Sequence, residues 1–332
     1  MVYIKKVLLL FGGNSSEHYI SCLSAKTIIE NIDQTKYDLT VVGIDNNSHF
    51  YIFNDELSYL DKGTWKEAEN IHLISNIINY IAQFDIVFPI THGNYGEDGK
   101  LQGFLDFFNF KYVGSKTLAS AIGMNKSIAK MIFNYLNIPQ VPHLTIEYPK
   151  YSIKKIIKEI GFPLIVKPAN GGSSIGISKV NNKNELINAI EEASSYDNVI
   201  IIEKFIIARE LECSVLENKK LVVSSIGEIV PISEFYDYSA KYESKESKLL
   251  IPAKLPKGVN NTIKKYAKLA FNNINGKGYA RVDFFYDEVN NKIYLNEINT
   301  IPGFTNISMF SQLLTFDTIS LSEIITILIE NA

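Results

Sequence analysis

Four polar residues occur in two spaced pairs near the C-terminal end of the sequence. Arg281 and Asp283 are two positions apart, as are Glu297 and Asn299, and residues 287–291 between them have the composition of a turn. Because side chains alternate between the two faces of a strand, each pair would share one face of a strand. A hairpin that sets Asp283 opposite Glu297 also sets Arg281 opposite Asn299, and the other face would carry Val282, Phe284, Tyr294 and Ile298.

Two carboxylates and an amide oxygen on one face are hard oxygen ligands. Mg²⁺ takes such ligands together with ATP phosphates. A surface hairpin with a solvated ion pair would show the same spacing, so the pattern alone leaves both interpretations open.

A glycine-rich segment follows a short apolar run in the middle of the sequence. The run 164–167 ends in Lys167, and residues 168–176 contain three glycines besides Ser173 and Ser174. Backbone N–H groups in such a turn can form an anion-binding nest, and the lysine adds a positive charge suited to phosphate. The segment matches neither a Walker loop nor a Rossmann fingerprint, and many glycine-rich turns bind nothing.

Charged residues also end the very apolar segment 199–205. Glu203 and Lys204 lie near its end, and Arg209 and Glu210 follow shortly after. Glu203 could accept a hydrogen bond from an adenine amino group, and Glu210 could accept one from a ribose hydroxyl. A solvated strand end would have the same composition.

Two further candidates lie in the N-terminal third. His92 follows an apolar segment, at a position where α/β sheets bind ligands, although a histidine that stabilises a turn would fit equally well. Glu17 lies at the start of an expected helix, where the helix dipole favours an acidic side chain in any protein.

The first part of the chain alternates strand and helix signals. Residues 7–11 are a buried-strand run before a glycine pair, and Asn14, Ser15 and Ser16 are good caps for a helix that would extend to about residue 32. Further strands are expected at 38–44, 85–90 and 111–114, with a helix at 100–108. This order predicts an open, doubly wound α/β sheet.

The remaining chain has the pattern of an α+β unit with antiparallel pairing. A helix is expected over 118–136, with a domain boundary near residue 121. The expected strands are 164–167, 175–180, 199–205, 211–216, 221–230, 279–286 and 292–299. The expected helices are 153–160, 185–193 and 259–273, followed by two closing helices. The polar segment 233–251 has no clear period, and a loop of that length is often a functional lid.

Composition narrows the class of protein. The 332 residues include 46% hydrophobic and 21% charged residues, which indicates a globular chain of two or three domains. Lys and Arg number 33 against 36 Asp and Glu, a balance that predicts neither a nucleic-acid partner nor binding to an anionic membrane. Cys22 and Cys213 form no ligand pattern, and we expect free thiols in a reducing cytoplasm.

Five of these segments, in this order, resemble the signatures of the D-alanine–D-alanine ligase family of the ATP-grasp superfamily. They are FGGNSSEH (11–18), HGNYGEDGKLQG (92–103), KPANGGSSIG (167–176), RVDF (281–284) and NEINTIPGFT (296–305). The resemblance implies a three-domain ATP-grasp fold of α/β and α+β type with an N-terminal open parallel α/β domain. The implied domains are residues 1–121, 122–210 and 211–332, with 233–251 as the lid.

The resemblance also implies a reaction. ATP would phosphorylate one D-alanine, and the amine of a second would attack the acyl phosphate, giving D-alanyl-D-alanine for peptidoglycan precursor synthesis. The implied ATP-binding residues are Lys126, Lys167, Glu203, Lys204, Ile206 and Glu210. The implied ligands of two Mg²⁺ ions, or of Mn²⁺, are Asp283, Glu297 and Asn299. A cytoplasmic homodimer is the implied assembly.

The substrate residues follow from the same resemblance. The implied substrate-binding residues are Glu17, His92, Tyr238, Arg281, Ser308 and Met309. The implied catalytic residues are Glu17, Ser173, Lys241, Tyr242, Arg281 and Gly303. Tyr242 in the lid favours D-alanine as the second substrate, and a ligase that uses D-serine or D-lactate is the alternative. Ala208, Gly171 and the pair Phe310–Ser311 depart from the family pattern.

Overall fold

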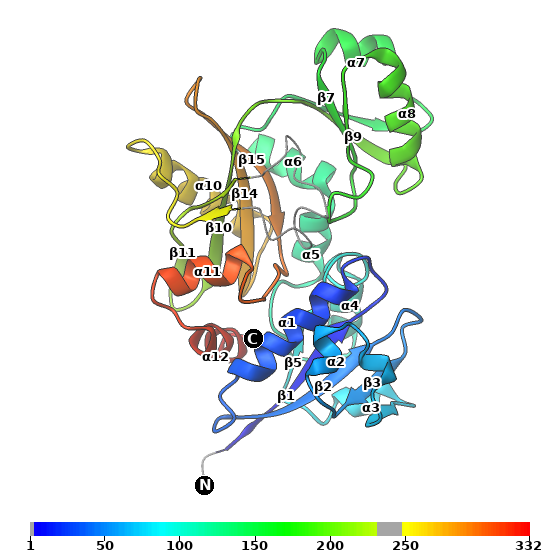
Figure 1. The fold of residues 1–332 in the computed structure, drawn as a ribbon, viewed down its shortest axis with the longest axis vertical. Coiled ribbons are helices and arrows are strands. Elements are labelled where there is room, and N and C mark those ends of the chain that lie inside the picture. The colour runs from blue at the N-terminus through cyan, green and yellow to red at the C-terminus, as the bar shows by residue number, and fades with distance from the viewer. Residues whose placement is uncertain (1–2, 231–247) are drawn as a thin grey trace.

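The computed structural model describes residues 3–230 and 248–332, which form three β-sheets with helices packed against them (Figure 1). The expected lid residues 233–247, which include Tyr238, Lys241 and Tyr242, lie outside the described part of the chain.

The N-terminal sheet has the strand order β4-β3-β2-β1-β5. β1 (Lys5–Gly12) pairs in parallel with β2 (Tyr37–Ile44) and β5 (Ile86–Pro89), as the buried apolar runs predict. The structure adds two antiparallel strands beyond β2, β3 (Phe50–Phe53) and the edge strand β4 (Ile71–Leu73), which were not predicted. The expected strand at 111–114 is only an isolated bridge between Val87 and Tyr112.

Helices surround this sheet. They are α1 (His18–Asn31), α2 (Ser58–Asp61), η1 (Trp65–Glu67), α3 (Ile77–Ile81) and α4 (Lys100–Phe107). α1 begins later than expected because Ser15 does not cap it. The Ser15 hydroxyl accepts from the backbone N–H of Glu17 at 3.0 Å and donates to the carbonyl of His92 at 2.7 Å, so it ties two loops together.

The single helix expected over 118–136 is wrong, since Asn125 divides it into α5 (Thr117–Met124) and α6 (Lys126–Tyr135). Asn125 has an extended backbone, and its side chain caps α6 by accepting from the N–H of Ile128 at 3.1 Å. The same residue forms an isolated bridge with Asn170. The break therefore places Lys126 beside the glycine-rich segment.

The second sheet has the order β6-β9-β7-β8 and is antiparallel throughout. Its strands are β6 (His143–Glu147), β7 (Leu164–Pro168), β8 (Ser178–Val180) and β9 (Val199–Lys204). Helices α7 (Ile153–Glu159) and α8 (Lys183–Ser194) pack with it around a separate apolar core.

The third sheet has the order β13-β12-β10-β14-β15, with β11 paired to β10. Its strands are β10 (Arg209–Glu217), β11 (Leu221–Val223), β12 (Gly227–Val230), β13 (Lys248–Leu250), β14 (Tyr279–Asp287) and β15 (Lys292–Asn299). Residues 248–250, expected to be part of the lid, thus form an edge strand. Helix α10 (Val259–Asn273) lies where it was predicted.

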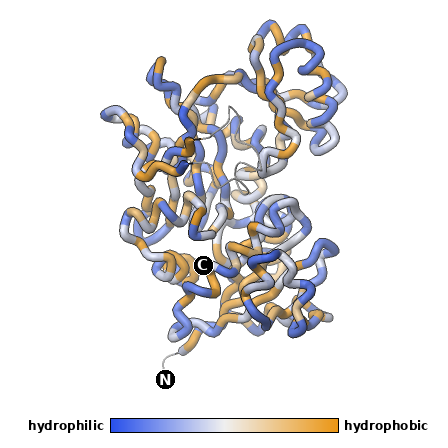
Figure 2. The backbone as a smooth tube through the Cα atoms, viewed as in Figure 1, coloured by the Kyte–Doolittle hydropathy of each residue, from blue (hydrophilic) through white to orange (hydrophobic). Residues whose placement is uncertain are grey.

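Helices α11 (Met309–Phe316) and α12 (Leu321–Glu330) close the chain. Ile325 and Leu328 of α12 share one buried core with Phe11 of β1 and Ile28 of α1, so the C-terminal end packs on the N-terminal sheet. Figure 2 shows the concentration of apolar residues in α12 and in the N-terminal strands.

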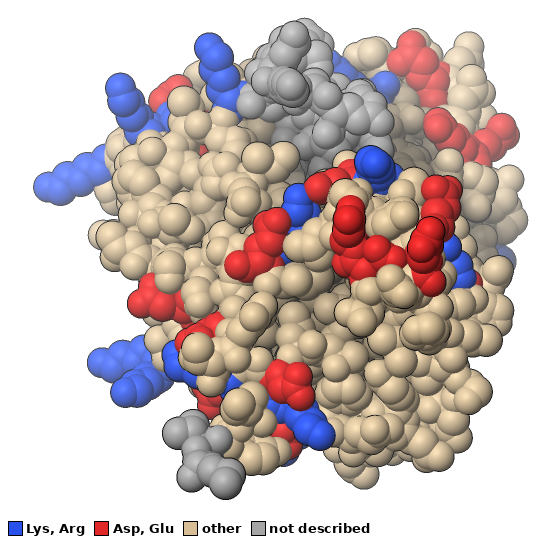
Figure 3. All heavy atoms as spheres, turned by 60° about the horizontal axis from the view of Figure 1, so that its bottom comes forward, with Lys and Arg blue, Asp and Glu red and all other residues tan. Residues whose placement is uncertain are grey.

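Charged side chains of both signs are interspersed on the face drawn in Figure 3. Among residues 3–230 and 248–332, no single helix is long and apolar enough to cross a membrane. Only α11 and α12 taken together meet that test, and they are bent by 102° at the break between them.

Candidate active site

The hairpin of β14 and β15 has the register that the sequence analysis assumed. Asp283 pairs with Glu297, and Arg281 pairs with Asn299. A bulge follows Asp283, so that Phe284 pairs with Leu295 and Asn296 is the additional residue. The prediction that Tyr294 belongs to the apolar face is therefore wrong, because the bulge gives that place to Leu295, which is fully buried.

Arg281 lies between two acidic residues. Its guanidinium donates to both carboxylate oxygens of Asp283 at 2.8 and 2.7 Å, and its Nε lies 3.0 Å from Glu212 of β10. Burial opposes the charge, but the two carboxylates outweigh it and raise the pKa of Arg281 further above its usual range. Arg281 is thus a fixed positive charge, and Glu212 is a neighbour that the sequence analysis did not identify.

The predicted metal ligands lie on one face of the hairpin. The amide of Asn299 donates to Asp283 at 3.2 Å, and each carboxylate oxygen keeps further lone pairs for a cation. Within the described residues, no three His, Cys, Asp or Glu side chains form a ready metal cluster. Two carboxylates and one amide oxygen fit a hard cation that takes its other ligands from phosphate and water.

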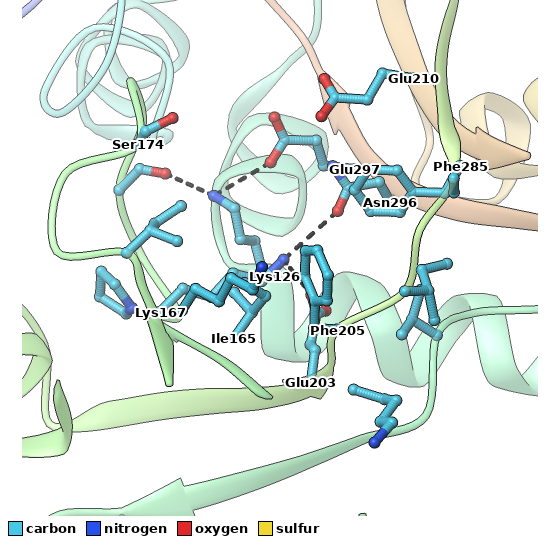
Figure 4. Close-up of a pocket in the computed structure, with 18 of the residues that line it drawn as sticks. Lys126, Ile165, Lys167, Ser174, Glu203, Phe205, Glu210, Phe285, Asn296 and Glu297 are labelled. Carbon is cyan, nitrogen blue, oxygen red and sulfur yellow. Dashed lines mark hydrogen bonds and ion pairs between the residues drawn. The ribbon is translucent and has the colours of Figure 1, made fainter. Parts of the chain in front are cut away.

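Lys126 joins the hairpin to the glycine-rich segment. Its ammonium donates to the carbonyl of Gly171 at 2.6 Å and lies 3.5 Å from the Glu297 carboxylate (Figure 4). In the same segment Ser173 and Ser174 both have positive φ, at 52° and 60°, which is a costly conformation for residues other than glycine. The turn is therefore held in one shape by its surroundings.

Glu203 lies between two buried lysines. Its carboxylate oxygens are 2.7 Å from Lys130 and 2.8 Å from Lys167, and all three side chains are at most 6% exposed. Burial opposes ionisation, but the two ammonium groups prevail and hold the pKa of Glu203 well below its usual range. The sequence analysis missed Lys130, although it lies four residues after Lys126 and so on the same face of a helix.

Lys126, Lys167 and Glu203 line a cavity of about 430 Å³ between the second and third sheets. Apolar side chains of Val141, Ile165, Phe205 and Phe285 form part of its wall, and Lys126, Lys167, Glu210 and Glu297 add charged groups. A planar apolar ring with a charged tail fits such a lining. Ile206 and Lys204 also line the cavity. The ammonium of Lys204, however, donates to the carbonyls of Gly161 and Phe162, so only its backbone and stem remain for a ligand.

A smaller hollow of about 50 Å³ lies beside the hairpin. Its lining includes Glu17, His92, Ser173, Arg281 and Gly303, which the sequence analysis singled out. The Ser173 hydroxyl donates to the Glu17 carboxylate. A side chain at Gly172 would come within 3.4 Å of that carboxylate, so glycine there allows the glycine-rich turn to approach Glu17 closely.

Glu97 also lines this hollow and was not among the predicted site residues. Burial, reinforced by the nearby carboxylates of Glu17 and Glu297, raises the pKa of Glu97 well above its usual range. Glu97 lies in the segment 92–103 noted above, but only the fold brings its carboxylate close to those of Glu17 and Glu297.

Three further predicted substrate residues have contacts within the protein, as Glu17 and Arg281 do. Both ring nitrogens of His92 have protein partners, the Ser24 hydroxyl and the carbonyl of Ile301, each at 2.9 Å. The Ser308 hydroxyl bonds Thr305. The Met309 side chain is buried against Ile229 and Leu313 rather than directed to the hollow.

Comparisons with known proteins agree with this geometry. Residues 6–115 match the family described as D-ala D-ala ligase N-terminus, and residues 132–330 match the one described as D-ala D-ala ligase C-terminus. The chain belongs to the D-alanine–D-alanine ligase family.

Relatives and solved structures cover almost the whole chain. It is 40% identical to the D-alanine–D-alanine ligase of Acetivibrio thermocellus, across 99% of this chain and 96% of that one. It is 44% identical to the same enzyme of Thermoanaerobacter sp. strain X514, across 93% and 91%.

Among solved structures, the VanG D-Ala:D-Ser ligase of Enterococcus faecalis superposes with a TM-score of 0.89 at 33% identity, covering 99% of both chains. The D-alanine–D-alanine ligase of Coxiella burnetii superposes with a TM-score of 0.83 at 31% identity, covering 99% of this chain and 93% of that one. The predicted ATP-grasp fold class is confirmed.

Proposed function

We propose that this protein joins two D-alanine molecules into D-alanyl-D-alanine with the hydrolysis of ATP to ADP and phosphate, as a step in peptidoglycan precursor synthesis. The observation that carries the proposal is the position of Glu297. Glu297 lines the large cavity, the hollow beside the hairpin and a third hollow between them. It therefore lies where the phosphate end of a nucleotide in the cavity would meet an amino-acid carboxylate in the hollow.

The cavity supports the placement of ATP. Phe205 and Phe285 offer a slot for the adenine ring, and Glu203 and Glu210 offer acceptors for its amino group and for the ribose. Lys126, Lys167 and the backbone of the glycine-rich turn would hold the phosphates. Asp283, Glu297 and Asn299 would bind two Mg²⁺ ions, or Mn²⁺, which supply charge neutralisation for phosphoryl transfer.

The hollow supports the placement of the first D-alanine. Glu17 would pair with its ammonium group, and Arg281 would attract its carboxylate. That carboxylate attacks the γ-phosphorus, ADP leaves, and an acyl phosphate remains. The amine of the second D-alanine then attacks the acyl carbon, and Arg281 with the backbone N–H of Gly303 would stabilise the oxyanion until phosphate leaves. Ser308 and Met309 would meet the second carboxylate, Met309 through its backbone.

Water must be kept from the acyl phosphate, since hydrolysis would waste it. The predicted lid residues 233–247, with Tyr238, Lys241 and Tyr242, lie outside the described part of the chain, and their exclusion of water stays a prediction from the family resemblance. The proposed domains are residues 1–121, 122–210 and 211–332, and the proposed assembly is a homodimer in the cytoplasm.

A D-alanine–D-serine ligase is the second candidate. It is favoured by one observation, the close superposition on the VanG D-Ala:D-Ser ligase. Both candidates share the first chemical step and differ only in the second substrate.

Product analysis separates the two candidates. Purified protein with ATP and Mg²⁺ should form mainly D-alanyl-D-alanine from D-alanine, and should still do so when equal D-serine or D-lactate is added. Predominant formation of the mixed product would contradict the choice of second substrate. Glu297→Gln should lower the rate at least about 100-fold while folding normally. Glu191→Gln, on the exposed face of α8, is the matched control and should leave the rate unchanged.

A further inference from the structure

A chain of buried hydrogen bonds connects α1 to the loop that carries Gly303. The backbone N–H of Phe304 donates to the Ser24 hydroxyl at 3.1 Å. The Ser24 oxygen lies 2.9 Å from Nε2 of His92, and Nδ1 of His92 lies 2.9 Å from the carbonyl of Ile301. The loop is thus held at Ile301 and again at Phe304, on either side of Gly303.

Only one arrangement of protons satisfies this chain. The carbonyl of Ile301 can only accept, so Nδ1 of His92 carries the proton, and Nε2 is then an acceptor. The Ser24 hydroxyl accepts from Phe304 and donates to Nε2. Ser24 is fully buried and His92 is 4% exposed. Burial lowers the pKa of His92, in agreement with the neutral ring that this arrangement requires.

The two anchors leave little freedom between them. Pro302 restricts its own φ, and only Gly303 between the anchors has the backbone freedom of a residue without a side chain. A Cβ at Gly303 would lie 2.9 Å from the Ser308 hydroxyl, so the loop also fits closely on its other side. Gly303 and Ile301 both line the hollow that contains Glu17 and Arg281.

We propose that Ser24, acting through Phe304 and His92, is a positioning residue that fixes the backbone of Gly303 where the oxyanion forms. The proposal rests on the function proposed above and adds a residue 279 positions away in sequence that touches no substrate. It also changes the role of His92, whose ring nitrogens hold the loop and not the substrate. Loss of the Ser24 anchor should slow only the second step, in which the amine attacks the acyl phosphate.

A matched pair of variants tests this role. Ser21 lies on the same face of α1, one turn before Ser24, and is equally buried. Its hydroxyl accepts from the N–H of Gly12 and donates to the carbonyl of Ile90, each at 2.7 Å, and neither partner belongs to the loop that carries Gly303. Ser24→Ala and Ser21→Ala therefore remove the same atoms from the same helix and differ in whether the loop loses an anchor.

The measurement is the ratio of ADP formed to dipeptide formed, together with kcat and the KM for ATP. In Ser24→Ala we expect kcat for dipeptide to fall about 10-fold or more. The KM for ATP should stay within about 2-fold of wild type, since Ser24 is remote from the nucleotide cavity. The ratio should rise above one, because an acyl phosphate that waits for the amine reacts with water, returning D-alanine and phosphate. Ser21→Ala should keep both the wild-type ratio and kcat.

Thermal unfolding of both variants shows whether they fold. Ser24→Cys is a third variant, of similar volume but with weaker hydrogen bonding, and it should give an intermediate ratio of ADP to dipeptide. A ratio of one in Ser24→Ala and Ser24→Cys, or equal effects in Ser21→Ala, would overturn the proposal. A wild-type protein that forms ADP but no dipeptide would instead contradict the proposed function.

Discussion

The Glu203 carboxylate illustrates how single residues in this protein depend on their neighbours. Both of its oxygens face ammonium groups, those of Lys130 and Lys167, in a nearly dry environment. A buried carboxylate of this kind is stable only while its partners remain, because an unpaired buried charge is costly. Lys130 does not line the proposed nucleotide cavity, but it holds Glu203, which does.

Lys130→Met should destabilise the protein by about 3 kcal/mol, and it should raise the KM for ATP because Glu203 and Lys167 lose their fixed positions. Urea unfolding and nucleotide-dependent kinetics measure the two effects. The exposed Lys155 on α7 offers a control, and Lys155→Met should change stability by less than about 0.5 kcal/mol. Equal effects of the two variants would contradict the role given to Lys130.

The contribution of His92 to the stability of the protein should depend on pH. Burial lowers its pKa in the folded protein, whereas the unfolded chain takes up a proton below about pH 6.5. The unfolded state then binds more protons, so the contribution of His92 to stability is full above that pH and is lost as the pH falls.

His92→Asn removes the titrating group. The variant should be less stable than wild type at pH 7.5, and the difference should narrow toward pH 5, by at most about 1.4 kcal/mol per pH unit. Urea unfolding at several pH values measures this. A difference that stays constant with pH would show that the pKa of His92 is not lowered in the folded protein.

At the scale of elements, the β14–β15 hairpin shows what the sequence could and could not predict. The spacing of Arg281, Asp283, Glu297 and Asn299 predicted which residues share a face, because a strand has a period of two, whereas the register had to be assumed and is confirmed by the structure. The bulge was not predictable from that spacing, because the additional residue Asn296 interrupts the regular alternation. The break at Asn125 was missed because its backbone pairs with Asn170, which is distant in sequence.

Some site residues were likewise predictable from the sequence, and others were not. Glu17, Lys167 and Arg281 lie in recognisable segments, Lys126 was implied by the family resemblance, and the structure brings all four to the cavity or the hollow. Ser24, Glu97, Lys130 and Glu212 were not singled out, because their importance comes from burial and from partners that are distant in sequence.

The bulge gives a prediction for the hairpin. Leu295→Ala should cost about 2–5 kcal/mol because it opens a cavity among Val282, Phe284 and Ile298. Tyr294→Ala should cost at least about 1 kcal/mol less, since Tyr294 is only partly buried. Urea unfolding of the two variants measures the difference. The reverse order of the two costs would mean that the bulge is absent in solution.

At the scale of the whole molecule, the three sheets meet around the proposed reaction centre. The second and third sheets enclose the cavity, and the N-terminal part supplies Glu17 and His92 to the hollow. Ser173 lines both spaces, and Glu297 lines these two and the hollow between them. We propose that a carboxylate in the hollow takes the γ-phosphoryl group of ATP in the cavity before the peptide bond forms.

Oxygen transfer from labelled substrate tests that claim most directly. D-alanine carrying ¹⁸O in both carboxylate oxygens is incubated with ATP, Mg²⁺ and the protein, and the phosphate released is analysed by mass spectrometry. Attack of the carboxylate on the γ-phosphorus predicts one ¹⁸O atom in each phosphate and one in the new peptide carbonyl. Release of unlabelled phosphate, or of pyrophosphate with AMP, would contradict the account.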